Sequence, residues 1–158
     1  MDLEIAIDDP RSADVRDLLA VHLALSRTLT PPEYSFALDV DDLVDDAVAF
    51  FSARHGGRLV GIAALKRLEP THAELKSMHT LEAQRGRGIG RALVDHILGF
   101  ARAAGYQCVS LETGATDEFV GARTLYARCG FRPCAPFGDY AASPYNTFMT
   151  IELDNERA

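Results

Sequence analysis

The sequence predicts a single α/β domain with a central mixed, twisted β-sheet of about seven strands, flanked by about four helices. Three observations lead to this fold class. The 158 residues are enough for one domain, 1–158, and too few for two enzyme domains. Strand alternation and helical spacing of apolar residues follow one another in the order β-α-α-β-β-β-α-β-α-β-β. A His55-Gly56-Gly57 turn between two apolar runs indicates a β-hairpin.

The first predicted elements are a strand and a helix. Apolar alternation over residues 3–7 predicts the strand, and Asp8-Asp9-Pro10 predicts the turn that ends it. A helix is expected over 13–27, with Ser12 or Asp14 as its N-cap, before Pro31-Pro32. Its apolar positions at helical spacing are Val15, Leu18, Leu19, Val21 and Leu25.

The middle of the chain is rich in predicted strands. A short helix over 39–46 precedes two strands, 47–51 and 59–65, which form the hairpin. Another strand covers 72–81. These elements place three strands in succession before the next helix.

The last part of the chain alternates helices with strands. A long helix over 88–104 ends at Gly105, and its apolar stripe consists of Ala92, Leu93, Ile97 and Phe100. A strand over 107–113 and a helix over 117–129, which ends at Gly130, come next. Strands near 131 and over 145–153 complete the prediction.

Charge is unevenly distributed along the chain. Residues 1–50 hold 3 Lys and Arg against 12 Asp and Glu, whereas the remainder holds 13 against 11. Because nucleic-acid binding rests on neutralising phosphates, we expect neither a nucleic-acid nor an anionic-membrane partner. The longest apolar stretch, 59–65, is far below the roughly 18 residues that span a bilayer. The acidic N-terminus lacks a signal-peptide n-region, so the expected location is the cytoplasm.

The chain has three cysteines, Cys108, Cys129 and Cys134. Their number is odd, and no CxxC or Cys/His ligand spacing occurs. We therefore expect free thiols and no bound metal.

The segment Arg85-Gly86-Arg87-Gly88-Ile89-Gly90 carries the strongest chemical signal. Its alternate glycines let backbone N–H groups turn toward a ligand, and the following helix start adds partial positive charge. This combination favours an anion such as a pyrophosphate, although a plain Gly-rich turn is the alternative. The spacing differs from the GxGxxG and GxxxxGK[ST] motifs of dinucleotide and ATP folds.

Two motifs resemble those of the GCN5-related N-acetyltransferases, the GNAT family. Glu74-Leu75-Lys76-Ser77-Met78-His79-Thr80, followed by residues 85–93, resembles motif A, with its (Arg/Gln)-x-x-Gly-x-(Gly/Ala) signature. Ala122-Arg123-Thr124-Leu125-Tyr126-Ala127-Arg128-Cys129-Gly130-Phe131 resembles motif B. The resemblance is strong over 72–131 and extends by element order to nearly the whole chain. It implies transfer of an acetyl group from acetyl-CoA to a primary amine of a small molecule or peptide.

The resemblance also implies where acetyl-CoA binds. Backbone amides of 85–90 would hold its pyrophosphate, and the preceding strand would pair with its pantetheine amides like an added strand. The residues expected at acetyl-CoA are Met78, His79, Thr80, Arg85, Gly86, Arg87, Gly88, Ile89, Gly90, Arg91 and Tyr126. Phe119 is a departure, because the family often has an Asn there that contacts CoA.

The resemblance assigns Tyr126 as the general acid, since a phenol stays protonated at neutral pH. A packed core aromatic is the alternative for this residue. Glu74 is the candidate general base, with His79 as its rival. The non-catalytic explanation is that 74–76 form a polar strand face on which Lys76 pairs with a neighbour. On a regular strand Glu74 and His79 face opposite sides, and a β-bulge would change this.

In this fold the first two helices and their connection, residues 27–50, commonly form a wall of the acceptor pocket. We expect Glu33 and Tyr34, together with Glu112 and Thr113 at the end of the neighbouring strand, to contact the substrate. Further carboxylates in the segment would favour a cationic amine as substrate. The alternative is that these carboxylates form a solvated acidic helix face, which is the more common role of such a run of charges. These carboxylates are Asp39, Asp41, Asp42, Asp45 and Asp46.

Two other functions stay open from the sequence. A non-catalytic CoA or acyl-CoA sensor needs the anion-binding turn but neither Tyr126 nor Glu74. A protein-interaction domain predicts no CoA binding at all. A homodimer through the C-terminal strands, 131–153, is a further expectation.

Overall fold

A computed structural model describes residues 2–153 and contains a seven-stranded mixed sheet. Its strands, in chain order, are β1 (Glu4–Ile7), β2 (Val48–His55), β3 (Arg58–Glu69), β4 (His72–Thr80), β5 (Cys108–Gly114), β6 (Arg132–Pro133) and β7 (Asn146–Glu152). Across the sheet the order is β1-β2-β3-β4-β5-β7-β6. The β4 and β5 pair is parallel, and the other neighbours are antiparallel.

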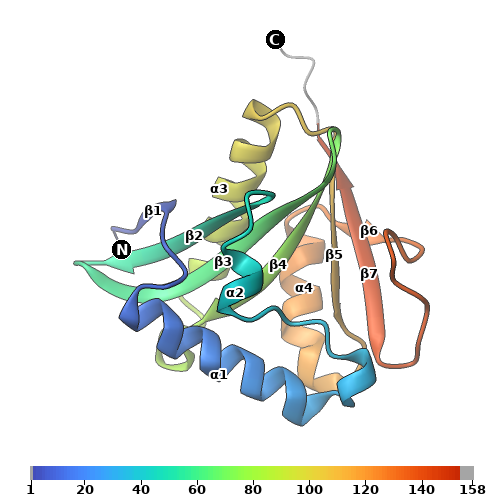
Figure 1. Ribbon diagram of the computed structural model, residues 1–158, viewed down its shortest axis with the longest axis horizontal. Helices are drawn as coiled ribbons and strands as arrows, with labels where there is room; N and C mark the ends of the chain where they lie inside the picture. Colours follow the sequence, from blue (N-terminus) through green and yellow to red (C-terminus); the bar gives the residue numbers. More distant parts are fainter. Residues whose placement is uncertain (1, 154–158) are drawn as a thin grey trace.

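Four α-helices cover the two faces of this sheet (Figure 1). They are α1 (Ala13–Leu29), α2 (Val40–Leu43), α3 (Ile89–Ala103) and α4 (Val120–Arg128). The predicted order of helices and strands is confirmed. The second helix is shorter than predicted, since its Asp39–Asp42 capping box defines the start and the helix ends at Leu43. The fourth begins later, because 117–119 form a separate 3-10 turn.

Two apolar clusters hold the layers together. One joins α3 and α4 to the sheet and includes Leu93, Ile97 and Tyr126. The other joins α1 and α2 to the opposite face. The prediction for α1 is partly wrong: Val15, Leu18 and Leu19 are buried, whereas Val21 and Leu25 are 56% and 40% exposed. The C-terminal part of α1 therefore runs past the apolar cluster, and Leu25 lies at a pocket.

A β-bulge interrupts β4 at its centre. Lys76 pairs with Ala64 and His79 pairs with Ile62, so β4 uses three steps where β3 uses two. Ser77, within the bulge, has φ 57°, a left-handed conformation that is costly for a residue with a Cβ. The extra residue brings His79 to the same sheet face as Glu74. The opposite placement expected for a regular strand does not occur.

Strands β4 and β5 separate after a short paired stretch. Their parallel pairing joins 72–75 to 108–111 and ends at Leu75 and Leu111. Figure 1 shows the two strands diverging beyond this point, with α4 beside the gap. The β5-facing edge of 76–80 is consequently outside the parallel ladder.

No helix within residues 2–153 has the length and apolar character needed to cross a bilayer.

Candidate active site

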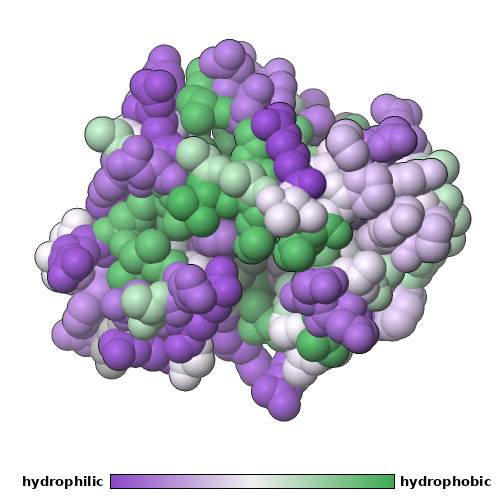
Figure 2. Space-filling view, turned by 90° about the horizontal axis from the view of Figure 1, so that it is seen from below, coloured by the Kyte–Doolittle hydropathy of each residue, from purple (hydrophilic) through white to green (hydrophobic). Residues whose placement is uncertain are grey.

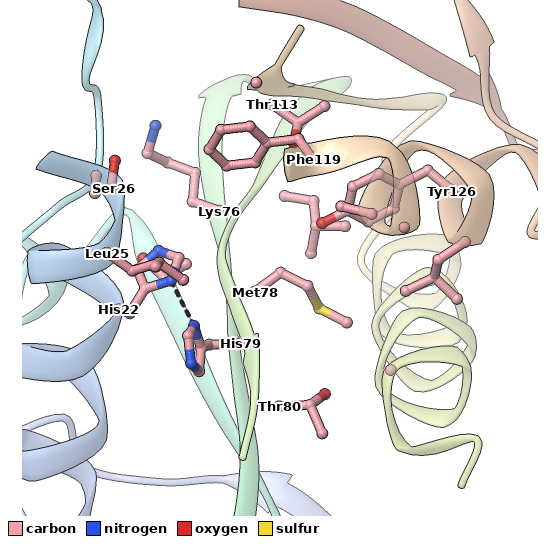
Figure 3. Close-up of a pocket in the computed structure, with 18 of the residues that line it drawn as sticks. His22, Leu25, Ser26, Lys76, Met78, His79, Thr80, Thr113, Phe119 and Tyr126 are labelled. Atoms are coloured by element: carbon pink, nitrogen blue, oxygen red, sulfur yellow. Dashed lines mark hydrogen bonds between the residues drawn. The ribbon is translucent and has the colours of Figure 1, made fainter. Parts of the chain in front are cut away.

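A pocket of about 910 Å³ lies where β4 and β5 separate. Its lining comes from α1, residues 34–37, β4, the 84–91 segment, the end of β5, and α4 with the turn before it. Figure 3 shows His22, Leu25 and Ser26 from α1 on one side, β4 in the middle, and Phe119 and Tyr126 on the other. Seen from below, the molecule shows apolar side chains along the middle of a hollowed face, with hydrophilic ones around them (Figure 2).

The Gly-rich segment forms a turn at one end of this pocket. Gly86 and Gly88 have φ of 82° and 83°, and Gly88 is the N-cap of α3. Both conformations are accessible to glycine at no steric cost. The first turn of α3 has no acidic residue, so its free N–H groups and positive dipole end stay available to an anion. The segment thus has the geometry of an anion site.

Most residues predicted at acetyl-CoA line the pocket. They are Met78, His79, Thr80, Arg85, Gly86, Gly88, Ile89, Gly90, Arg91 and Tyr126. Arg87 is the exception: its side chain is exposed and the residue is not part of the lining. Arg85 is also exposed, and its Nε donates to the Thr80 carbonyl at 3.3 Å at the edge of the pocket.

Two glycines allow close packing around the pocket. A Cβ on Gly90 would lie 2.9 Å from Leu125 Cδ2, so α3 and α4 approach closely here. A Cβ on Gly114 would lie 2.0 Å from the Phe119 ring. Phe119, at the position where the family often has Asn, therefore occupies space that the Gly114 backbone leaves open. The missing Asn is visible in the sequence, whereas the packing of the Phe119 ring against Gly114 is not.

Tyr126 extends from α4 into the pocket and is 6% exposed. Its ring also contacts Phe131 edge-on, at 5.9 Å between centroids. Burial raises the pKa of the Tyr126 phenol well above its usual value, and the Cys129 and Glu112 charges add to the effect. The phenol is therefore protonated throughout the neutral range, and the side chain is both a core aromatic and a pocket group.

Glu74 is buried in a three-member polar cluster on β4. Lys76 Nζ donates to Glu74 Oε2 at 3.0 Å and to the Tyr140 hydroxyl at 2.8 Å. The Tyr140 hydroxyl donates to the same Glu74 oxygen at 2.5 Å. Burial, followed by the Glu74 charge, raises the pKa of Tyr140. The sequence suggested that Lys76 pairs with a neighbour without naming it; the partners are Glu74 and Tyr140. Tyr140 was not foreseen because it lies 66 residues from Glu74.

His79 meets a second imidazole that sequence analysis missed. His22 Nδ1, from α1, lies 3.0 Å from His79 Nδ1, and the rings are nearly perpendicular at 81° (Figure 3). Burial and the His79 charge lower the pKa of His22 to about 4. Burial and the Arg85 charge also lower the pKa of His79. Both rings are thus neutral near pH 7, and both line the pocket.

The predicted acceptor residues divide into two groups. Tyr34, Glu112 and Thr113 line the pocket, whereas Glu33 is exposed and lies outside the lining. Asn146 Nδ2 ties two of them together, since it donates to Glu112 Oε2 at 2.6 Å and to the Tyr34 carbonyl at 3.0 Å. Burial, with the Glu74 charge, raises the pKa of Glu112. Glu33 lies outside the pocket because it belongs to the 3-10 turn Pro32–Tyr34 and is exposed to solvent, and its contact with a substrate stays a prediction.

The acidic residues after Phe36 also lie outside the pocket lining. Asp39 and Asp42 form the capping box of α2, and Asp45 accepts from the Ala47 amide at 2.8 Å. Their contacts are those of helix and turn formation. The solvated acidic face, which the sequence also allowed, describes these residues better than a lining for a cationic substrate.

Among residues 2–153 no cluster of three or more His, Cys, Asp or Glu side chains is arranged to hold a metal ion. Cys108, Cys129 and Cys134 are free thiols, as expected, and burial raises the pKa of each.

Comparison with known proteins identifies the family. Residues 16–131 match the Acetyltransferase (GNAT) family model. The uncharacterized N-acetyltransferase YsnE of Bacillus subtilis (strain 168) is 38% identical, over 96% of this chain and 100% of its own length.

Solved structures share the fold. A protein described as an acyl-CoA N-acyltransferase of Klebsiella pneumoniae is 26% identical, with a TM-score of 0.79 over 96% of this chain and 98% of its own. A GNAT family acetyltransferase of Elizabethkingia anophelis, solved with acetyl-CoA bound, is 18% identical, with a TM-score of 0.72 over 96% and 98% of the two chains. The motif-bearing pocket, the sheet topology and these similarities agree: the chain belongs to the GNAT family and is an N-acetyltransferase.

Proposed function

We propose that this protein transfers the acetyl group of acetyl-CoA to a primary amine of a small molecule or peptide by direct attack. The observation that carries the proposal is the continuity of one pocket. It runs from the anion-binding turn at the start of α3, past Tyr126, to the side chains of α1 and residues 34–37. A single cavity of this kind supports simultaneous binding of acetyl-CoA and an acceptor.

The residues of the pocket fit acetyl-CoA. The turn 85–90 and the α3 N-terminus offer backbone N–H groups for the pyrophosphate, with Arg85 and Arg91 beside them. The unpaired edge of β4 after Leu75 offers amides and carbonyls for the pantetheine. The Elizabethkingia structure, which has the same fold and acetyl-CoA bound, supports acetyl-CoA as the ligand.

Two features serve the thioester. The bulge leaves Ser77 and Met78 without β3 partners, and we propose that a backbone N–H freed there polarises the thioester carbonyl. Tyr126, protonated and buried opposite Met78, is the proposed general acid. As the amine nitrogen bonds to the carbonyl carbon and the C–S bond breaks, the Tyr126 proton passes to the CoA sulfur.

The attacking ammonium must first lose a proton to a base. Glu74, the sequence's first choice, is held by Lys76 and Tyr140, and its protonation would leave Lys76 without its counter-ion in a buried position. His79 is neutral and borders the bulge. We therefore assign the base to His79 and a structural role to Glu74.

The acceptor side of the pocket favours an amine with an apolar part. Tyr34, Phe36 and Phe119 supply aromatic surface, and Glu112 supplies a half-buried carboxylate for the ammonium. In this proposal Tyr34, Glu112 and Thr113 remain substrate residues. Glu112, rather than the solvated carboxylates of 39–46, recognises the charge of the amine.

Thiol release from acetyl-CoA across a panel of amines tests the proposed function. We expect turnover with at least one arylalkylamine or peptide amine, and Tyr126→Phe should lower kcat by about 100-fold, since it removes the proton donor. Tyr145 lies outside the pocket lining, so Tyr145→Phe is a matched control and should leave kcat within twofold of wild type. Binding of CoA without turnover across the panel would favour the sensor instead.

A further inference from the structure

His22 and His79 form a pair whose geometry restricts their protons. Their Nδ1 atoms are 3.0 Å apart, a hydrogen-bond distance, so one Nδ1 donates its hydrogen and the other accepts it. Two imidazolium rings would place two hydrogens between the same nitrogens. The pair therefore holds a single proton between its rings and accepts at most one more.

This restriction also sets the outer nitrogens. The ring that donates through Nδ1 has an unprotonated Nε2 when neutral, and the ring that accepts carries its proton on Nε2. One Nε2 of the pair is thus a base and the other is a donor. An isolated neutral histidine in water exchanges between its two tautomers, so neither of its nitrogens is fixed as the base.

The surroundings keep the pair neutral before reaction. The charged side chains that share the pocket with the pair are Glu74, Lys76, Arg85, Arg91, Glu112, Glu118 and Arg128. Arg85 lies near enough to His79 to disfavour an added positive charge there. Glu74 has Lys76 as its partner and Glu112 is bonded to Asn146, so these carboxylates already have close partners.

We propose that His22 is a positioning residue, which holds His79 in the Nδ1–H tautomer and thereby makes His79 Nε2 the general base. This inference rests on the proposed function and extends it to a residue outside the two family motifs. His79 is assigned the base because it adjoins Met78 and Thr80 along the unpaired edge of β4.

The proton balance of the step is simple. The substrate ammonium loses one proton to His79 Nε2, and the resulting imidazolium keeps its Nδ1–H···Nδ1 bond to neutral His22. The amine lone pair then forms the new C–N bond as the C–S bond breaks and Tyr126 gives its proton to the departing sulfur. The surplus proton on the nitrogen passes to the Tyr126 phenolate, which restores the phenol. The proton leaves His79 for solvent after the product departs, which restores the starting tautomer.

The resting protein provides a test that needs no turnover. Nitrogen-15 NMR of the imidazoles at pH 7 should show His79 protonated on Nδ1 and His22 protonated on Nε2. The opposite tautomers, or both rings protonated on Nε2 alone, would overturn the assignment. Asparagine and leucine variants at position 22 identify the signals.

Steady-state kinetics supply the second test. His22→Leu removes the acceptor and should lower kcat by at least about tenfold, with KM for acetyl-CoA unchanged. His22→Asn, whose amide oxygen can accept the same hydrogen bond, should recover kcat to within about threefold of wild type. His79→Asn should lose about 100-fold, as expected for removal of a general base.

The outcomes separate the two proposals. If the wild type is active and His22→Leu has the same kcat, the positioning role of His22 is refuted and the proposed function stands. An equal loss of kcat in His22→Leu and His22→Asn has the same meaning. A wild type that transfers no acetyl group contradicts the proposed function itself. In that case the NMR tautomers still report whether the pair is organised as inferred.

Discussion

Titratable side chains in this pocket meet partners that change their chemistry. His79 faces a second imidazole, Glu74 faces a buried ammonium and a phenol, and Glu112 faces an amide. Each residue type alone is compatible with a general base. The partner limits which group is free to take a proton, and on this ground we propose His79 rather than Glu74 as the base.

The histidine pair should make stability depend on pH. The folded state keeps His22 neutral down to a pKa of about 4, whereas an unfolded histidine titrates near 6.5. As pH falls from 6.5 to 4, the unfolded chain takes up the proton first, so stability is full above this window and is lost within it. The loss from His22 is on the order of 3 kcal/mol, and His79 acts in the same direction.

Denaturant unfolding at several pH values checks this prediction. Glu112, whose pKa is raised, opposes the trend, while Asp8 and Asp14, whose pKa values are lowered, act below the window. Because these groups are present in both proteins, comparison with His22→Leu isolates the histidine. The unfolding free energy of the variant should fall less steeply than that of the wild type between pH 6.5 and 4. Parallel curves of unfolding free energy against pH would contradict the role given to His22.

At the level of elements, one inserted residue in β4 reorganises the site. The bulge turns His79 to the face that carries Glu74, directs Met78 toward α3 and α4, and places Ser77 at φ 57°. The Ser77 hydroxyl is buried and has no hydrogen-bond partner within residues 2–153. Strain and an unpaired polar group at a pocket indicate a conformation retained for function.

Substitutions at Ser77 separate these two costs. Ser77→Gly removes the strained Cβ and the hydroxyl, whereas Ser77→Ala removes only the hydroxyl. The glycine variant should be more stable than the alanine variant by about 0.5 to 1 kcal/mol, after the entropic cost of glycine is included. Equal unfolding free energies would show that the left-handed conformation costs little here.

For the whole molecule, the pocket gathers groups from almost every part of the chain. Residues of α1, β4, the α3 start, the β5 end and α4 surround one cavity. A ligand in that cavity binds the folded state and not the unfolded chain. CoA at a hundredfold excess over its Kd should therefore raise the unfolding free energy by about 2.7 kcal/mol.

A matched pair of arginine variants makes this measurement specific. Arg85 lines the pocket, and Arg87, two residues on in the same turn, does not. Arg85→Gln should lower CoA-induced stabilisation by about 1 kcal/mol, as expected for one charged hydrogen bond, and Arg87→Gln should lower it less. Thermal shift with and without CoA measures this stabilisation. An equal loss of stabilisation in the two variants would show that Arg87 contributes to CoA binding as much as Arg85 does.

Local pattern was enough to predict the order of the elements and most of the residues that line the pocket around the start of α3. Their binding of acetyl-CoA stays a proposal. Strand alternation, helical spacing and the Gly-rich turn are properties of contiguous residues, and so are motifs A and B. Their side chains and amides act from one stretch of chain, 74–91, and from one helix. The turn conformation at Gly86 and Gly88 follows from the residues themselves.

What the tertiary structure decided is which distant groups meet. His22 and His79 are 57 residues apart, and Tyr140 and Glu74 are 66 apart. Glu33 points away from the pocket while its neighbour Tyr34 lines it. These outcomes depend on how α1 crosses the sheet, on the bulge in β4 and on the path of 137–146. No pattern within a segment encodes such contacts, because each depends on the packing of the other segments.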